Sequence, residues 1–208
     1  MQLVKGKNNS RSTRLSCFHT NIRSLKHHLD HFQTHLLNEL NFNFNVIGVT
    51  ETRIRNEIID FNPSIPNYNF EFVPTPLFAG GVGMYIDDTL KYSVIERTTN
   101  EAFQSLWLEI EFAKQSNVIC GVVYRQHNSP ERFLEYFEEA ISRYSASGKL
   151  IYLCGDFNRN ILKAQNCNFA QEFLNCVQSY GLLPTVDKPT RVYNNSATLI
   201  DNIFINKF

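Results

Sequence analysis

Three short runs of almost purely apolar residues constrain the fold of this chain more than any other feature: Val46–Val49, Val118–Val123 and Ile151–Cys154. Each run is shorter than a typical helix and alternates little between polar and apolar residues. This pattern is typical of strands that are covered on both faces. The chain is therefore expected to build a β-sheet with further layers packed on each side of it.

Helical and strand-like segments alternate along the rest of the chain. After Ser24, a predicted helix N-cap, apolar residues recur at helical spacing from Leu25 to Leu40. Further helices are predicted to begin at Ser129-Pro130 and to span residues 168–180, and the other predicted strands are Leu15–Phe18, Phe70–Val73, Val82–Ile86, Tyr92–Arg97, Leu106–Phe112 and Thr198–Ile205. This order indicates an α/β protein in which two stacked mixed β-sheets are flanked by helices.

The composition favours a large apolar core. Hydrophobic residues make up 43% of the 208 residues, with 17 Phe and 9 Tyr among them, which excludes a disordered chain. We expect one folded domain over residues 15–208. The preceding residues, 1–14, contain Lys and Arg but no acid and are predicted to form a flexible basic tail.

Charge and cysteine usage narrow the setting in which the protein acts. Lys and Arg number 20, as do Asp and Glu, so a polyanionic partner would have to be bound by a local basic patch. The five cysteines show no CxxC spacing, and Cys120 and Cys154 lie in apolar runs, which predicts buried thiols in a reducing, intracellular compartment. Because no apolar run approaches the roughly 18 residues of a membrane span, no membrane partner is expected.

Polar residues stand at the ends of the predicted buried strands. They are Asn21, Glu51, Tyr124, Asp156, Asn158 and Asp201. Functional sites are commonly built from loops at one rim of a rigid sheet, so these side chains would converge if the strand ends share a rim. Each residue alone has an ordinary explanation in turn formation, solvent exposure or internal pairing, and only the combination indicates a site.

The residue types fit phosphodiester hydrolysis, which requires a hard cation, an aligned water and support for the leaving oxygen. Glu51 is a candidate Mg²⁺ ligand with Asn21 beside it, and Asp156 is a candidate for orienting or deprotonating water. The candidate supports for the phosphate oxygens are Asn158, Tyr124 and Arg125. No serine or cysteine nucleophile with an obvious base accompanies them.

Six sequence segments carry a family resemblance: Asn21–Leu25, Thr50–Thr52, Gly80–Tyr85, Val123–Arg125, Gly155–Asn158 and Thr198–Phe204. The Gly-Asp-Phe-Asn and Ile-Asp-x-Ile segments are the most specific of them. Together the segments resemble the endonuclease/exonuclease/phosphatase superfamily, and within it the apurinic-like endonuclease domain of non-LTR retrotransposons. The resemblance extends from about residue 15 to the end of the chain.

This resemblance implies a four-layer α/β sandwich and an enzyme that nicks double-stranded DNA with Mg²⁺, for which Mn²⁺ could substitute. The nick would leave a 3′ hydroxyl that primes reverse transcription, so a reverse transcriptase domain in the same polyprotein and action in the nucleus are implied as well. No small-molecule cofactor is implied. An inactive binding module, or a phosphodiesterase acting on a lipid or another small molecule, remain the alternatives.

Residue roles follow from the resemblance by position. Glu51 resembles the metal ligand with Asn21 as its neighbour, and Asp156 resembles the water-activating aspartate. Asn158 resembles the asparagine that orients the phosphate, and Tyr124 the tyrosine that faces it. Thr190 is similar to a threonine near the DNA.

Asp201 resembles the family's aspartate that holds a catalytic histidine from a later Ser-Asp-His motif. That motif does not occur in these 208 residues, and none of the six histidines can replace it in sequence order. We therefore expect either an excerpt of a longer polyprotein or a relic that has lost its end. In both cases the last strand would be missing and one sheet edge would be unpaired.

Several cations fall near the predicted rim: Arg23, Lys26, Arg53, Arg55, Arg125, Lys188 and Arg191. They are candidates for the local basic patch, and Arg23, Arg125 and Arg191 are the predicted DNA contacts together with Thr190. His27, His31 and His35 lie opposite the leucine stripe of the first helix, which favours a solvated helix face over a metal site.

Overall fold

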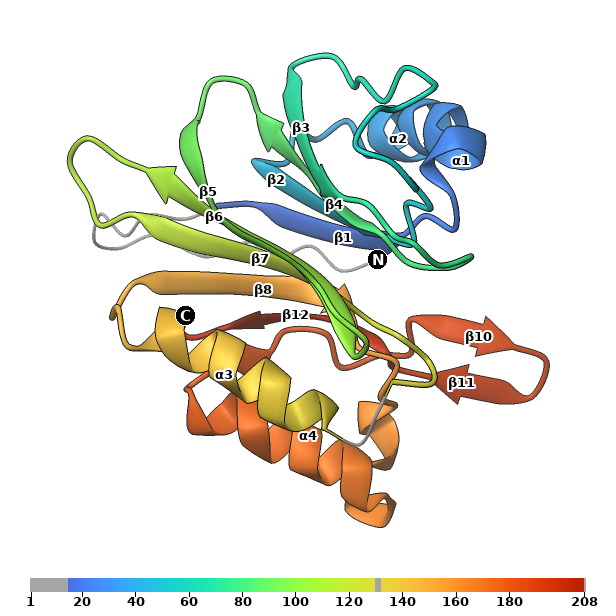
Figure 1. Cartoon of the computed structure of the whole chain (residues 1–208), viewed down its shortest axis with the longest axis vertical. Helices are drawn as coiled ribbons and strands as arrows, with labels where there is room; N and C mark the ends of the chain where they lie inside the picture. The colour runs from blue at the N-terminus through green and yellow to red at the C-terminus, as the bar shows by residue number, and fades with distance from the viewer. Residues whose placement is uncertain (1–14, 130–131, 208) are drawn as a thin grey trace.

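Most strands of the protein form two stacked sheets, as seen in a computed structural model that describes residues 15–129 and 132–207 (Figure 1). The predicted basic tail over residues 1–14 lies outside the described residues. One sheet has four strands in the order β1-β2-β4-β3, and the other has six in the order β5-β6-β7-β8-β12-β9.

The four-stranded sheet consists of β1 (Cys17–Asn21), β2 (Val46–Thr50), β4 (Val82–Asp87) and β3 (Tyr68–Val73). Strands β1 and β2 are parallel, and the other pairs are antiparallel. The six-stranded sheet consists of β5 (Lys91–Thr99), β6 (Phe103–Glu111), β7 (Val118–Arg125), β8 (Leu150–Asp156), β12 (Asp201–Ile205) and β9 (Leu183–Pro184). Only β7 and β8 are parallel in this sheet.

Helices cover the outer face of each sheet (Figure 1). On the four-stranded sheet, α1 (Leu25–His31), the π-helix η1 (Phe32–Leu37) and α2 (Asn38–Leu40) follow one another directly. On the six-stranded sheet lie α3 (Phe133–Ser145) and α4 (Asn168–Ser179), the latter preceded by the 3₁₀-helix η2 (Ile161–Asn166). The α/β sandwich with two stacked mixed sheets and flanking helices is thus confirmed.

The period-two alternation of the strands separates the cores. In β7, Ile119 and Val123 pack in the core with the aromatic residues of α3 and α4, whereas Cys120 and Val122 pack between the sheets. Cys154 of β8 and Val46 of β2 belong to this inter-sheet core. Cys120 and Cys154 are buried and all five cysteines are free, as predicted.

Polar residues end three of the inward-facing rows. Residues 17, 19 and 21 of β1, residues 152, 154 and 156 of β8, and residues 205, 203 and 201 of β12 are the alternate positions that face the space between the sheets. Each row is apolar or thiol-bearing at one end of the sandwich and polar at the other. The site described below is therefore the polar end of the inter-sheet core.

Several boundaries differ from the prediction. Ser24 does not cap α1 with its side chain, because its Oγ bonds to Nδ1 of His27 at 2.8 Å. Helix α3 begins at Phe133. The strand predicted over Thr198–Ile205 is two strands, because the main chain at Leu199 and Ile200 bonds to the loop after β8 instead. None of the helices among the described residues is long and apolar enough to cross a membrane.

Candidate active site

Strand register aligns three of the predicted residues in one row across the six-stranded sheet. Asp156 of β8 is opposite Tyr124 of β7 on one side and Asp201 of β12 on the other. In the facing sheet, Asn21 of β1 is opposite Thr50 of β2, and Glu51 follows directly. The ends of both sheets meet here, which confirms that these strand ends share a rim.

The side-chain amide of Asn21 joins the two sheets at this rim. Its Nδ2 donates to Oε1 of Glu51 and to Oδ2 of Asp156, each at 2.8 Å. Its Oδ1 accepts from the backbone N–H of Arg23 at 3.2 Å. One neutral amide thus fixes two carboxylates that come from different sheets.

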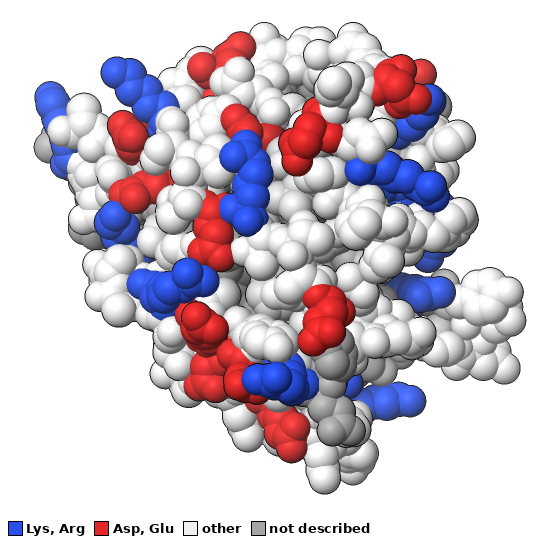
Figure 2. Space-filling view, viewed as in Figure 1, with Lys and Arg blue, Asp and Glu red and all other residues white. Residues whose placement is uncertain are grey.

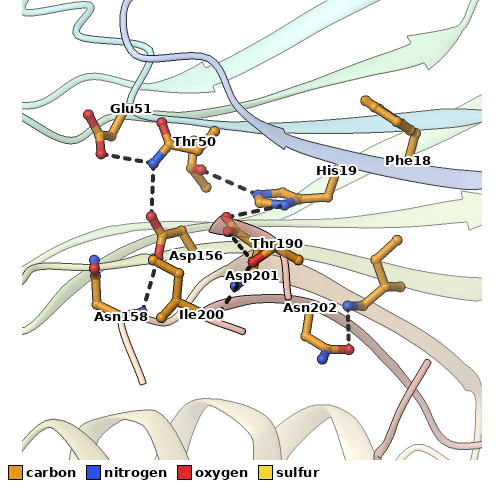
Figure 3. A network of polar contacts seen from close by, with 12 residues as sticks. Phe18, His19, Thr50, Glu51, Asp156, Asn158, Thr190, Ile200, Asp201 and Asn202 are labelled. Atoms are coloured by element: carbon orange, nitrogen blue, oxygen red, sulfur yellow. Dashed lines mark hydrogen bonds and ion pairs between the residues drawn. The ribbon is translucent and has the colours of Figure 1, made fainter. Parts of the chain in front are cut away.

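A second group of contacts surrounds Asp201 (Figure 3). Thr190 donates its hydroxyl to Oδ2 of Asp201 at 2.8 Å. Nδ1 of His19 lies 3.9 Å from Oδ1 of Asp201, and its Nε2 lies 3.3 Å from Oγ1 of Thr50. Oδ1 of Asp201 is buried and has no hydrogen-bond partner among the described residues. A histidine therefore stands beside Asp201 after all, although it comes from β1 and not from a later strand.

Both groups line one cavity of about 440 Å³ between the two sheets. The predicted site residues in its wall are Asn21, Arg23, Glu51, Asp156, Asn158, Thr190, Arg191 and Asp201. Its size and its mixture of polar and apolar walls suit one nucleotide-sized group. Tyr124 and Arg125 do not line it.

Tyr124 lies behind the cavity wall. Its ring is buried in the inter-sheet core and faces Gly80, whose backbone has a φ of +119° that favours glycine. Burial, together with the charges of Glu51 and Asp156, raises the pKa of Tyr124 above its usual range. The phenol is therefore protonated at neutral pH.

Arg125, a predicted DNA contact, is buried in this structure. Its side chain is only 4% exposed and stacks on Phe133, with the guanidinium carbon 5.1 Å from the ring centre. Burial and the charge of Arg159 lower the pKa of Arg125 to about 10, so it keeps its positive charge at neutral pH. Its carbonyl accepts from Nδ2 of Asn158 at 2.6 Å, and its Nη1 donates to the carbonyl of Asn158 at 3.5 Å. Arg125 therefore fixes the position of Asn158 through its carbonyl and its guanidinium group.

Backbone conformations at this rim are unusual. Arg23, Ser24, Glu51, Arg53 and Asn158 all have positive φ, between 48° and 108°, although none is glycine. Such conformations are costly and persist where surrounding bonds fix them. Here Ser24 donates its N–H to the carbonyl of Glu51 at 2.8 Å, and Arg53 donates its N–H to the carbonyl of Gly80 at 2.9 Å.

Burial dominates the electrostatics of Asp156, which is 2% exposed. Burial and the charges of Asp201 and Glu51 raise its pKa to about 7, although hydrogen bonds from Asn21 and from the backbone N–H of Asn158 favour the charged form. A carboxyl group with a pKa near neutrality accepts a proton effectively at that pH.

The same pKa shift predicts how stability depends on pH when divalent ions are removed with EDTA. In the unfolded chain Asp156 ionises near pH 4, whereas in the folded chain it ionises near pH 7. The folded protein therefore loses stability from Asp156 as the pH rises through this window. Urea unfolding at several pH values should show that the free energy of unfolding falls less steeply with rising pH for Asp156→Asn than for the wild type. Equal slopes for the two proteins would contradict the raised pKa, and Asp88→Asn, at an exposed turn, is the control.

The donor set at the rim fits a hard divalent cation. Glu51 and Asp156 both accept from the neutral amide of Asn21, and the second oxygen of Glu51 accepts from Nη2 of Arg53 at 3.3 Å. The buried Oδ1 of Asp201, which has no hydrogen-bond partner among the described residues, adds negative charge nearby. Oxygen donors of this kind are those that Mg²⁺ prefers. Within the described ranges, no group of three His, Cys, Asp or Glu side chains is arranged for a metal; Glu51 and Asn21, which meet at 2.8 Å, remain the predicted ligands.

A hairpin beside the cavity was not predicted. Strands β10 (Arg191–Tyr193) and β11 (Ser196–Thr198) project from the body of the protein, with Val192 and Tyr193 exposed (Figure 1). The Asn194-Asn195 pair is the signal that could have revealed its two-residue turn, since Asn tolerates positive φ. Acidic and basic side chains are interspersed over the face in Figure 2, and basic ones stand along the edge where the hairpin projects.

The two stacked sheets and their flanking helices form a fold that is shared with solved proteins of the endonuclease/exonuclease/phosphatase type. No family model and no curated protein matches the sequence. The endonuclease domain of TRAS1, a telomere-specific non-LTR retrotransposon, is similar with a TM-score of 0.67 and 12% identity, covering 89% of this chain and 82% of that domain.

Two further solved structures share the fold. The AP endonuclease LMAP from Leishmania major has a TM-score of 0.66 and 12% identity, covering 91% of this chain and 77% of LMAP. The 3′ phosphatase NExo from Neisseria, bound to a product DNA hairpin, has a TM-score of 0.61 and 11% identity, covering 92% of this chain and 86% of NExo. The structural neighbours thus include hydrolytic nucleases and phosphatases.

Proposed function

We propose that the protein is a Mg²⁺-dependent endonuclease that nicks double-stranded DNA, as the endonuclease domain of a non-LTR retrotransposon or its remnant. The observation that carries this proposal is the Asn21 amide, which holds the carboxylates of Glu51 and Asp156 at 2.8 Å each in the wall of one cavity. The fold shared with the TRAS1 endonuclease domain and with NExo bound to DNA supports the choice of DNA as the substrate.

In this proposal Asp156 is the general base. It takes a proton from a water molecule whose oxygen forms a bond to phosphorus, and the bond from phosphorus to the 3′ oxygen breaks. The products are a 5′ phosphate and, after proton uptake, a 3′ hydroxyl. Asn21 orients Asp156 and Glu51, while Asn158, fixed by Arg125, faces the phosphate group.

A bound Mg²⁺ would stabilise negative charge that develops on the phosphate oxygens. Glu51 would hold it with a carboxylate oxygen, and the side-chain oxygen of Asn21 is the second candidate ligand. Thr190 and His19 would keep Asp201 in place at the other side of the cavity. A reverse transcriptase in the same polyprotein and action in the nucleus belong to this proposal as its biological setting.

The test is conversion of supercoiled plasmid to relaxed circles with and without Mg²⁺. Glu51→Gln keeps the size of the side chain but removes its charge, and we expect it to lower the nicking rate by about a hundredfold or more. Raising the Mg²⁺ concentration should restore part of this loss, because a weakened site fills at higher concentration. The matched control is Glu111→Gln, an exposed residue at the opposite end of the six-stranded sheet.

Three results would reject the proposal. Nicking that persists in EDTA would show that the reaction does not depend on a divalent metal. Nicking by Glu51→Gln at the rate of the wild type would show that Glu51 is not part of the active site. Turnover of a small phosphomonoester or of an inositol phosphate without any nicking would favour the phosphatase activity named for other proteins of this fold, such as ANGEL2, a 2′,3′-cyclic phosphatase.

A further inference from the structure

A second cavity of about 480 Å³ lies beside the first, between the start of α1, the loop that follows Glu51 and the loop that carries Phe78. We call it the Phe78 groove; its wall includes Lys26, Arg53, Arg55, Ile58, Asp60 and Phe78. Arg53 connects the two cavities, because its Nη2 donates to Oε2 of Glu51 at 3.3 Å.

The apolar part of the groove is open to solvent. Phe78 is 76% exposed and Ile58 is 87% exposed, whereas most large apolar residues of the chain are buried. The guanidinium carbon of Arg53 lies 5.3 Å from the centre of the Phe78 ring. An exposed ring beside an arginine is the arrangement on which nucleic-acid bases stack.

The charged part of the groove has an excess of positive charge. Lys26 is paired with Asp60 at 2.7 Å, and Arg53 is paired with Glu51 at 3.3 Å. Arg55 is exposed and has no ion pair among the residues that the structure describes. Nε of Arg53 is buried and likewise lacks a hydrogen-bond partner within the described part of the chain. Arg55 is therefore free to bind a phosphate backbone, and the side chain of Arg53, which is 34% exposed, can contribute its accessible end.

The groove is held in shape by main-chain bonds. Arg53 has a φ of +56° and donates its N–H to the carbonyl of Gly80 at 2.9 Å. Thr75 donates its N–H to the carbonyl of Ile54 at 2.8 Å. These bonds connect the two loops that form the groove, so little conformational freedom would be lost when a ligand binds.

We propose that the Phe78 groove binds an unpaired stretch of DNA next to the phosphate that is cleaved, with a base stacked on Phe78 and phosphates on Arg55 and Arg53. The inference rests on the proposed function, because it takes the strand in the first cavity to be DNA. It adds a preference to that function: DNA that is locally unpaired beside the nick should bind better than fully paired duplex.

The experiment measures equilibrium binding by fluorescence anisotropy in EDTA, so that turnover does not interfere. Two duplexes are compared, one fully paired and one with a short unpaired stretch that contains a fluorescent adenine analogue. The wild type should prefer the second duplex and quench the analogue. Phe78→Ala should weaken that binding by about tenfold and abolish the quenching, whereas Phe78→Trp should retain both.

Two further variants make the test specific. Tyr136→Ala removes another ring, on α3, that lies 5.1 Å from the guanidinium carbon of Arg132, and should leave binding unchanged. Arg55→Gln should reduce the salt dependence of binding by about one ion. Equal affinity and equal quenching for the wild type and Phe78→Ala, or tighter binding of the fully paired duplex, would overturn the inference.

Binding and nicking separate this inference from the proposed function. If the protein nicks plasmid but binds DNA independently of Phe78, the proposed function stands and the proposal that the Phe78 groove binds DNA is rejected. If the protein does not nick plasmid but its DNA binding and quenching depend on Phe78, the groove stands as a DNA-binding site and the proposed nicking activity is rejected.

Discussion

Replacement of Asp156 by alanine is expected to lower the rate of plasmid nicking by about a thousandfold, because general-base catalysis contributes roughly 10²–10⁴ to a rate. The substitution removes the only carboxylate that bonds to Asn21 from the six-stranded sheet among the described residues. It also removes the acceptor for the N–H of Asn158. Single-turnover nicking with saturating Mg²⁺ measures the chemical step directly.

The control for this prediction is Asp88→Ala, which removes an exposed carboxylate in the turn after β4. Thermal unfolding should confirm that both variants are folded. If Asp156→Ala is folded and nicks within a few-fold of the wild type, Asp156 is not the general base. In that case the carboxylates of Glu51 and Asp201 would have to be tested in its place.

Replacement of Phe173 by alanine should destabilise the protein by about 3–5 kcal/mol, the range for large-to-small changes in well-packed cores. Phe173 is fully buried on α4, and its ring centre lies 5.0 Å from that of Phe157 and 5.8 Å from that of Phe204. The loss would leave a cavity between α4 and the six-stranded sheet. Urea unfolding at neutral pH measures the effect.

Phe169→Ala is the matched control on the same helix, because Phe169 is about half exposed. We expect it to change the free energy of unfolding by less than about 1 kcal/mol. A loss of that small size for Phe173→Ala would mean that the surrounding aromatic residues collapse into the space. The cluster would then tolerate changes that a close-packed core does not.

Most of the architecture could be predicted from hydrophobic patterns. The continuous apolar runs at Val46–Val49, Val118–Val123 and Ile151–Cys154 became buried strands, because a strand between two layers has no solvent-facing positions. The helices at Leu25 and Phe133 followed from their apolar spacing. The polar residues could be assigned to strand ends from the sequence, but their convergence at one rim depends on the strand directions and pairing that the structure shows.

Residue environments that depend on the facing sheet could not be predicted in the same way. Sequence order alone gives no reason to pair His19 with Asp201, yet the stacking of β1 over β12 places Nδ1 of His19 3.9 Å from Oδ1 of that carboxylate. The signal available was its position two residues before Asn21, on the same face of a strand. The environment of Arg125 could not be predicted either. The sequence places Arg125 beside the rim, but its guanidinium group stacks on Phe133 because α3 packs against this strand.

The two carboxylates held by Asn21 belong to opposite halves of the sandwich, and this division limits how the protein can tolerate change. A slide of one sheet over the other by an ångström would break the amide bridge while every strand and helix stayed intact. Substitutions deep in the inter-sheet core, far from the cavity, can therefore disrupt the geometry of the site without unfolding the protein. The contacts between Asn21 and the two carboxylates therefore tolerate a smaller displacement of the sheets than the fold does.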